Sequence, residues 1–191
     1  MSSTNRGYER HKNDYYVTPI HNIVEFLEVF NQYEELDNIK VILDPSSGGD
    51  SENKMSYPEA LRNTYFNNAL IKTIDIRDDS PAEIKGDYLN LKLDYKPDMI
   101  ITNPPFSLAK EYVEKALNDV KDEGYVIILQ RLNFLGSKSR KEFWDNNPPK
   151  YIFVHHKRIS FTPDGKTDSI EYAHFVWQKG NKEKLAKLLV I

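Results

Sequence analysis

Four polar side chains that could bind or activate a ligand each follow a short apolar run typical of a strand. Three are acids, Asp44, Asp75 and Asp87, and the fourth is Asn103, the first residue of an Asn-Pro-Pro-Phe sequence. In open parallel sheets, ligands bind beyond the carboxyl ends of the strands. We therefore expect these four side chains to lie at one edge of a sheet, where they could bind a ligand rich in amines and hydroxyls.

The sequence Asn103-Pro104-Pro105-Phe106 makes the sharpest chemical prediction. Two consecutive prolines remove two backbone N–H donors and leave carbonyl oxygens without internal partners. The Asn103 side-chain oxygen and the Pro104 carbonyl could then accept both hydrogens of one NH₂ group and localise its lone pair for attack. Phe106 offers a face on which an aromatic ring can stack. The alternative is a rigid turn from a strand into a helix capped by Ser107.

The segment Asp44-Pro45-Ser46-Ser47-Gly48-Gly49 predicts a ligand-binding loop. Glycines after a buried strand let the backbone approach a ligand closely. The spacing matches neither the dinucleotide fingerprint nor a phosphate-binding loop, which disfavours a polyphosphate ligand. The acid at the strand end suits a ligand that carries an ammonium group and a sugar; the alternative is an ordinary turn.

Asp75 and Asp87 each have two interpretations. Asp75 could accept both hydroxyls of a ribose, or it could be a surface acid in an acid-rich run with Asp78 and Asp79. Asp87 follows Gly86 and could accept a hydrogen bond from the exocyclic amine of a purine, or it could be a turn residue.

Positive charge is concentrated in one segment, although the chain has a net charge of −3. Residues 131–166 contain eight Lys or Arg and three acids, whereas the rest of the chain is acidic. This asymmetry is expected if one face meets phosphates, and the alternative is a solvated charged loop. We expect Arg131, Lys157 and Arg158 to contact a nucleic acid and Phe161 to form a second wall of its pocket, unless Phe161 is a core residue.

The adjacent His155 and His156 are expected on the surface or facing phosphate, since no third ligand at suitable spacing indicates a metal. The chain has no Cys, which excludes disulfides, thiolate nucleophiles and Cys-ligated zinc. No apolar run approaches the ~20 residues of a membrane span, and the N-terminus lacks the apolar region of a signal peptide. The sequence predicts one cytoplasmic domain of 191 residues that binds no membrane, with residues 1–13 as a mobile arm.

Apolar strands and amphipathic helices alternate along the chain, which predicts an α/β domain with a mostly parallel sheet, helices on both faces and one antiparallel strand near the C-terminus. Helices are expected over 20–30, from a Ser cap at 56, from Ser107 to Gly124, over 139–144 and over 182–190. Strands are expected over 40–43, 70–74, 85–88, 99–102, 125–129, 151–154 and 173–177.

With these motifs in this order, the sequence resembles the S-adenosylmethionine-dependent DNA adenine N6-methyltransferases, particularly small phage-encoded ones. Asn103-Pro104-Pro105-Phe106 is similar to their catalytic motif and Asp44-Pro45-x-x-Gly48 to their cofactor loop. The segment 14–19, Asp-Tyr-Tyr-Val-Thr-Pro, is similar to the motif that closes over the methionine end of the cofactor. The resemblance covers residues 14–178 and implies a Rossmann-like class I methyltransferase fold.

The resemblance also implies a role for each matching residue. The methionine part of S-adenosylmethionine would meet Tyr16, Thr18, Pro19, Asp44, Pro45 and Gly48; its ribose would meet Asp75 and its adenine Asp87. Asn103 and Pro104 would hold the target amine and Phe106 would stack on the target base. The chain departs from the family at Asp50, where a second glycine is usual; Asp tolerates left-handed backbone, so the loop is still expected to form.

The family usually carries a separate target-recognition domain, and from this sequence we expect none. Recognition would then come from residues 131–166, from a partner chain or from a second copy in a homodimer. Two other functions stay open: the same chemistry on RNA or on a protein glutamine, and a non-catalytic S-adenosylmethionine-binding protein or methyltransferase subunit.

Overall fold

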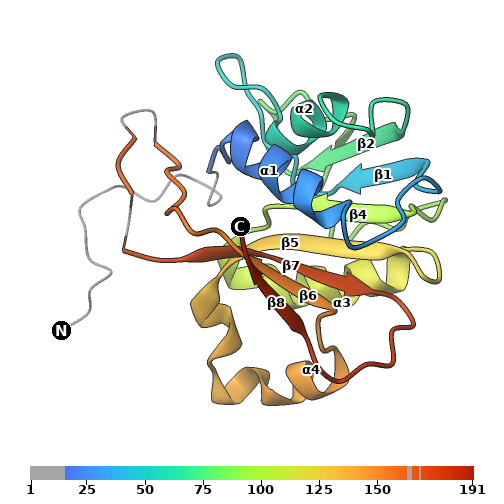
Figure 1. The fold of residues 1–191 in the computed structure, drawn as a ribbon. Helices are drawn as coiled ribbons and strands as arrows, with labels where there is room; N and C mark the ends of the chain where they lie inside the picture. Colours follow the sequence, from blue (N-terminus) through green and yellow to red (C-terminus); the bar gives the residue numbers. More distant parts are fainter. Residues whose placement is uncertain (1–15, 163–164, 168) are drawn as a thin grey trace.

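The computed structural model describes residues 16–162, 165–167 and 169–191, and its centre is an eight-stranded sheet (Figure 1). The expected arm over residues 1–13 lies outside the described residues, as do Asp14 and Tyr15 of the N-terminal motif. The strand order is β3-β2-β1-β4-β5-β7-β6-β8. The strands are β1 (Val41–Asp44), β2 (Leu70–Asp75), β3 (Ile84–Lys85), β4 (Met99–Thr102), β5 (Tyr125–Arg131), β6 (Tyr151–Val154), β7 (Tyr172–Gln178) and β8 (Lys187–Val190).

All neighbouring strands run parallel except β7, which is antiparallel to both β5 and β6. The central strand β4 is buried along its whole length, as expected for a parallel strand covered on both faces. The sequence-based prediction of an α/β fold with one antiparallel strand near the C-terminus is confirmed.

Helices cover both faces of the sheet and enclose two separate cores (Figure 1). One face carries α1 (Ile20–Phe30) and α2 (Ser56–Arg62); the other carries α3 (Ala109–Asp119) and α4 (Lys141–Asn146). In α1, Ile23, Phe26, Leu27 and Phe30 are fully buried. Their three- and four-residue spacing places them on one side of the helix, as the sequence predicts.

The predicted C-terminal helix over 182–190 is wrong. Residues Lys187–Val190 form β8, which adds to the outer edge of β6 in parallel, with Leu188 opposite Ile152. The spacing of the leucines in this segment fits a helix. The edge of β6, however, offers backbone hydrogen-bond partners, and the segment pairs with it as a strand.

The two predicted serine caps are also wrong. Ser56 is the first residue of α2 and follows Met55, and its side chain makes no capping hydrogen bond. After Pro105 a short 3₁₀ turn, Phe106–Leu108, precedes α3, and Ser107 is exposed. The chain therefore leaves the Asn-Pro-Pro-Phe motif through a tight turn before the longer helix begins.

The order in which strands are added to the sheet reverses between β1 and β4. The chain moves outward from β1 to β2 and β3 and then returns to place β4 on the other side of β1. Such a switch point leaves a crevice beyond the carboxyl ends of the strands, so Asp44, Asp75 and Asn103 come to one edge. In the part of the chain that the structure describes, no helix has the length and apolarity to span a membrane.

Candidate functional site

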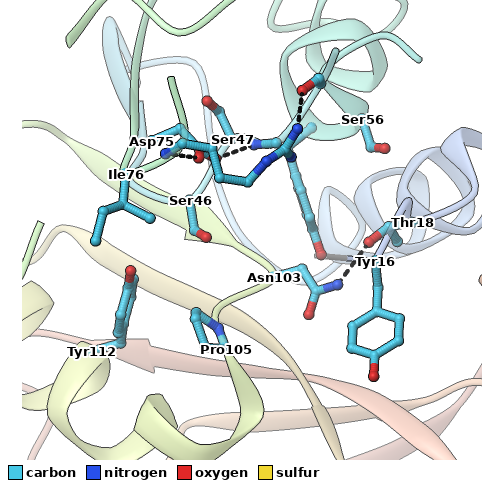
Figure 2. A pocket seen from close by; sticks show the side chains of 14 residues that line it. Tyr16, Thr18, Ser46, Ser47, Ser56, Asp75, Ile76, Asn103, Pro105 and Tyr112 are labelled. Atoms are coloured by element: carbon cyan, nitrogen blue, oxygen red, sulfur yellow. Dashed lines mark hydrogen bonds between the residues drawn. The ribbon is translucent and has the colours of Figure 1, made fainter. Parts of the chain in front are cut away.

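A pocket lies at this switch point (Figure 2). It is formed by the ends of β1, β2 and β4, the segment before α1, and side chains of α2 and α3. The lining residues are Tyr16, Thr18, Ser46, Ser47, Gly48, Gly49, Ser56, Tyr57, Asp75, Ile76, Arg77, Asn103, Pro105 and Tyr112.

Asn103 is held so that its side-chain oxygen is available. Its Nδ2 donates to Oγ1 of the buried Thr18 at 3.0 Å, as Figure 2 shows, whereas its Oδ1 is buried and has no hydrogen-bond partner. No hydrogen bond to the Pro104 carbonyl is found among the described residues. A buried acceptor without a partner costs about 1–3 kcal/mol, so this corner of the pocket is suited to a donor such as an amine.

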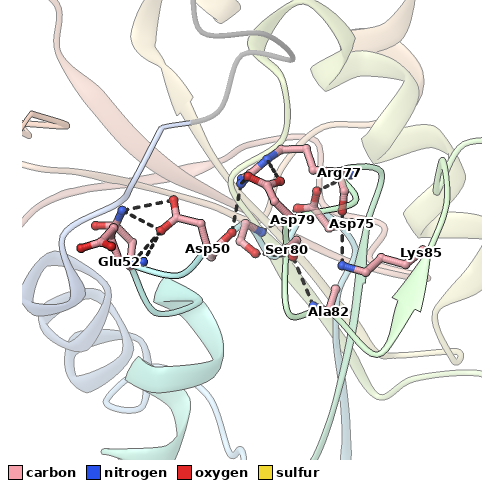
Figure 3. Close-up of polar contacts among 11 residues, drawn as sticks. Asp50, Glu52, Asp75, Arg77, Asp79, Ser80, Ala82 and Lys85 are labelled. Atoms are coloured by element: carbon pink, nitrogen blue, oxygen red, sulfur yellow. Dashed lines mark hydrogen bonds and ion pairs between the residues drawn. The ribbon is translucent and has the colours of Figure 1, made fainter.

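The glycine loop after β1 is shaped by two left-handed residues and by Asp75. Gly48 and Gly49 have φ of 64° and 77°. The N–H of Gly48 donates to Oδ2 of Asp75 at 2.7 Å, and the N–H of Arg77 donates to Oδ1 at 2.9 Å (Figure 3). The carboxylate of Asp75 therefore joins the ends of β1 and β2 and presents the loop backbone to the pocket.

Asp50 does not take the left-handed conformation that the sequence suggested. Gly48 and Gly49 adopt it instead, and Glu123 is the one non-glycine residue with positive φ in the described chain. The Asp50 carboxylate accepts hydrogen bonds from the N–H groups of Glu52 and Asn53 at 2.8 and 2.7 Å. It closes the turn that follows the loop (Figure 3), so the missing second glycine introduces no backbone strain.

Asp44 and Pro45 lie beneath the loop and do not line the pocket surface. Burial raises the pKa of the Asp44 carboxyl to about 7, and the nearby negative charge of Asp75 adds to this, although the N–H of Ser46, which donates to Asp44 Oδ1 at 3.2 Å, opposes the rise. A carboxyl placed so unfavourably for its charged form gains from a cation in the adjacent pocket. This donor set fits a ligand that carries an ammonium or another positive group.

Asp87 and Pro19 lie outside the pocket lining. The Asp87 carboxylate accepts hydrogen bonds from the N–H of Leu89 at 3.0 Å and the side chain of Asn90 at 2.6 Å. These contacts hold the turn after β3. The structure thus brings Tyr16, Thr18, Gly48, Asp75 and Asn103 together around one space, and Asp87 lies outside it.

Aromatic rings and one arginine surround Phe106 at the mouth of the pocket. The ring of Tyr16 stacks on Phe106 with centroids 5.8 Å apart, and Tyr16 also meets Phe161 edge-on at 5.8 Å. The guanidinium of Arg131 lies over the Phe106 ring at 4.5 Å. Phe161 is half-buried and packs against the core, and Phe161 and Phe106 both contact the rings of Tyr16 and Tyr172.

The other two basic residues that were expected to contact a nucleic acid, Lys157 and Arg158, are exposed. Lys157 and Arg158 follow β6, whose carboxyl end lies at the same edge of the sheet as the pocket. Arg158 forms an exposed ion pair with Glu171 at 3.3 Å.

The expected surface position of His155 is wrong. His155 is buried; its Nε2 bonds Nδ1 of His174 at 2.9 Å, and Nε2 of His174 bonds the Tyr57 hydroxyl at 3.0 Å. Burial lowers the pKa of His155 to about 4. The pair is therefore neutral at physiological pH and tethers β6 and β7 to α2. His156 is exposed as expected.

Five pocket residues were missed from the sequence: Ser56, Tyr57, Ile76, Arg77 and Tyr112. Tyr57 and Tyr112 occur at positions that resemble helix core. Ile76 directly follows Asp75 and is 59% exposed, and Figure 2 shows it facing Tyr112 across one end of the pocket. An apolar residue directly after a strand-end acid is the signal that could have identified it.

Comparisons with known proteins establish the fold. No protein-family model matches the sequence, and no curated protein matches it. Among solved structures, a protein from Listeria monocytogenes assigned to the class I S-adenosylmethionine-dependent methyltransferases is 14% identical with a TM-score of 0.67; the match covers 97% of this chain and 68% of that one.

A type I restriction-modification methyltransferase subunit from Streptococcus thermophilus is 13% identical with a TM-score of 0.68, over 92% of this chain and 47% of that subunit. A protein from Pyrococcus horikoshii assigned as an RNA methyltransferase is 14% identical with a TM-score of 0.59, over 95% and 94%. The chain thus has the Rossmann-like α/β fold of these methyltransferase structures, with the predicted site residues at the end of its sheet.

Proposed function

We propose that this chain transfers a methyl group from S-adenosylmethionine to the exocyclic N6 amine of adenine in DNA. The observation that carries the proposal is the buried, unpartnered Oδ1 of Asn103 at the end of β4. With the carbonyl of the following Pro104 it would form a pair of acceptors for an aromatic amine, and Asn103 lines the same pocket as the glycine loop. The methyltransferase fold of the structural matches supports the same interpretation.

The pocket residues fit S-adenosylmethionine as the cofactor. The glycine loop and the buried acids Asp44 and Asp75 suit a ligand that carries an ammonium group and a ribose, and the open end between Ile76 and Tyr112 suits a flat ring. When bound, S-adenosylmethionine supplies a methyl group activated by a positively charged sulfur. Asp75 offers its remaining lone pairs to a ribose, and Tyr16 and Thr18 lie at the opposite end, beside Asn103.

The chain's own residues would act on the target amine by position and charge. Asn103 Oδ1 and the Pro104 carbonyl would accept hydrogen bonds from the two N–H groups of the amine. These bonds would direct the nitrogen lone pair into the pocket. Phe106 and Phe161 would bound the ring after Tyr16 moves aside. No basic side chain is needed to remove a proton before attack, because the amine is neutral; orientation and a preorganised polar environment would provide most of the acceleration.

RNA is the second candidate substrate. The structural match assigned as an RNA methyltransferase spans nearly all of both chains, and an unstacked base meets the same pocket in either nucleic acid. The match to a type I restriction-modification methyltransferase subunit favours DNA, with target recognition by residues 131–166, by a partner chain or by a second copy.

The test is to replace Asn103 by Ala and to measure binding and transfer separately. Loss of one positioned acceptor should reduce methyl transfer to DNA ~10²–10³-fold. Affinity for S-adenosylmethionine, measured by calorimetry, should change only a few-fold, because Asn103 acts on the substrate. Asn67→Ala, at an exposed asparagine after α2, is the control and should leave both unchanged.

Three outcomes would contradict the proposal. Transfer by Asn103→Ala at the wild-type rate would exclude the amine-binding role. Transfer by the wild type to RNA or to a glutamine peptide in place of DNA would assign the other substrate. Cofactor binding with no transfer to any of these acceptors would identify the chain as a non-catalytic cofactor-binding protein or subunit.

A further inference from the structure

Arg131, the last residue of β5, carries a charge that the described protein leaves uncompensated. Its guanidinium lies 4.5 Å from the centroid of the Phe106 ring. Its Nε is buried without a hydrogen-bond partner, and no ion pair of Arg131 is found among the described residues. A partly buried cation in this state is unfavourable unless a ligand supplies the missing acceptor.

The other arginines of the basic segment are already used by the protein. Arg140 also stacks on a phenylalanine, at 5.1 Å from Phe134, but it donates to the carbonyls of Phe134 and Asn133 at 2.8 and 3.2 Å. Arg158 pairs with Glu171. Arg131 therefore differs from both, because the Nε of its stacked guanidinium has no partner in the described part of the protein and is available to a ligand.

The surroundings of Arg131 indicate the chemistry of the missing acceptor. Phe106 also contacts Tyr16 and Tyr172, and Phe161 packs edge-on against Tyr172 at 4.9 Å. Several rings thus gather around a single positive charge, next to the unpartnered oxygen of Asn103. This combination suits a ligand that has a flat ring and an anionic group close to it. A nucleotide has both, whereas a glutamine side chain has neither.

We propose that Arg131 determines the substrate class of the target site by binding the phosphate beside the target base. The inference rests on the proposed function, because it takes the target amine to be held at Asn103. A guanidinium can bind a phosphate through two parallel hydrogen bonds. That contact satisfies the orphaned Nε, neutralises the charge over Phe106 and fixes the base between the aromatic rings and the Asn103 acceptor.

The experiment measures oligonucleotide binding by fluorescence anisotropy over a range of salt concentrations, without turnover. The probe is a labelled adenine-containing DNA oligonucleotide, with the RNA of the same sequence as a second arm. Arg131→Gln should weaken binding about tenfold, the low end expected for one charge-assisted hydrogen bond. It should also reduce the slope of log affinity against log salt by about one unit.

Two further variants make the result specific. Arg131→Lys keeps the charge and should restore the salt slope, though not the full affinity, because an ammonium cannot form the two parallel bonds. Arg140→Gln removes the same charge from the same segment and should leave the slope as in the wild type, because its guanidinium already serves the loop. All variants should melt within a few degrees of the wild type.

The outcomes separate this inference from the proposed chemistry. A wild-type slope in Arg131→Gln, or an equal loss in Arg131→Gln and Arg140→Gln, would overturn the role of Arg131 even if methyl transfer is observed. Binding with the predicted slopes but without methyl transfer would support Arg131 and reject the proposed reaction. A wild-type protein that binds neither oligonucleotide overturns the role of Arg131.

Discussion

At the scale of single residues, the reactive arrangement depends on a hydrogen bond that the sequence does not reveal. Thr18 and Asn103 are 85 positions apart, yet the Thr18 hydroxyl accepts from the Asn103 amide and leaves the opposite oxygen free. The resemblance assigned Thr18 to the cofactor. The contact gives it a positioning role toward the target amine, in addition to its place in the pocket lining.

Replacing Thr18 by Val should therefore lower the rate of methyl transfer more than it lowers cofactor affinity. Val preserves the volume but removes the acceptor, so the Asn103 amide can rotate and present its NH₂ to the substrate. We expect a loss of about tenfold or more in kcat, with KM for S-adenosylmethionine changed only a few-fold. Thr18→Ser, which keeps the hydroxyl, should recover most of kcat. Equal effects of Val and Ser on kcat would show that the hydrogen bond is unimportant.

The raised pKa of Asp44 makes both stability and cofactor binding depend on pH. The pKa is about 7 in the folded protein, against an ordinary value of 3.8. The folded state thus binds this proton more tightly than the unfolded state does. Its contribution to the free energy of unfolding is complete below pH 4, declines as pH rises toward 7 and is constant above that.

Urea unfolding at pH 5 and pH 8 should show this difference between the wild type and Asp44→Asn, which mimics the protonated carboxyl. The wild type should lose more stability than the variant between the two pH values. A positively charged ligand favours ionised Asp44, so S-adenosylmethionine should bind the wild type more tightly at pH 8 than at pH 5.5. It should also release protons when it binds near pH 6, measurable by calorimetry in buffers of different ionisation enthalpy. The same pH dependence in both proteins would exclude Asp44 as its source.

At the scale of elements, the backbone conformation of the glycine loop should determine how well the pocket binds its ligand. A Cβ added to Gly49 would lie 2.8 Å from Cγ of Met55, and the residue has φ of +77°. Gly49→Ala should therefore cost about 1–2 kcal/mol of stability for the left-handed backbone, and displacement of the loop should weaken S-adenosylmethionine binding.

Gly180→Ala is the matched control for this prediction. Gly180 has φ of +86°, but no atom lies within 4 Å of its added Cβ. It should lose melting temperature for the backbone conformation alone, with no change in cofactor affinity. If both variants leave cofactor affinity unchanged, the shape of the loop at Gly49 does not matter for the ligand.

The elements differ in how well the sequence predicts them. Helix α1 and the strands β1, β4 and β5 follow from apolar spacing, because each contributes its own buried face. The C-terminal strand β8 could not be predicted in this way. Leu185, Leu188 and Val190 are exposed, and the strand forms because the edge of β6 is open, which depends on the order of the whole sheet.

The candidate site shows the same division. Asn103, Gly48 and Asp75 are predictable, because each follows its strand directly in sequence. The buried pair His155 and His174 was not predictable, because it depends on the antiparallel register of β6 and β7. In that register Phe153 lies opposite His174. The contact of Arg131 with Phe106 likewise joins the ends of two strands and has no local signature.

At the scale of the whole molecule, the reversed direction of β7 separates the basic residues into two groups at opposite edges of the sheet. Lys157 and Arg158 follow the carboxyl end of β6, on the pocket edge. Lys182 and Lys184 lie between β7 and β8, and because β7 is antiparallel, that connection lies at the other edge. All four side chains are exposed. The two pairs therefore carry the same charge and differ mainly in their position on the molecule.

This separation predicts which charges a nucleic acid meets. The double variant Lys157→Ala/Arg158→Ala should weaken oligonucleotide binding and reduce the salt slope by about one unit, for the phosphate that Lys157 neutralises, because Arg158 is already paired with Glu171. Lys182→Ala/Lys184→Ala changes the net charge equally and should leave the slope near that of the wild type, since its residues face away from the pocket. Cofactor affinity should be unchanged in both. Equal reductions of the salt slope in the two double variants would mean that net charge governs the binding. The pocket edge would then not be the nucleic-acid-binding face.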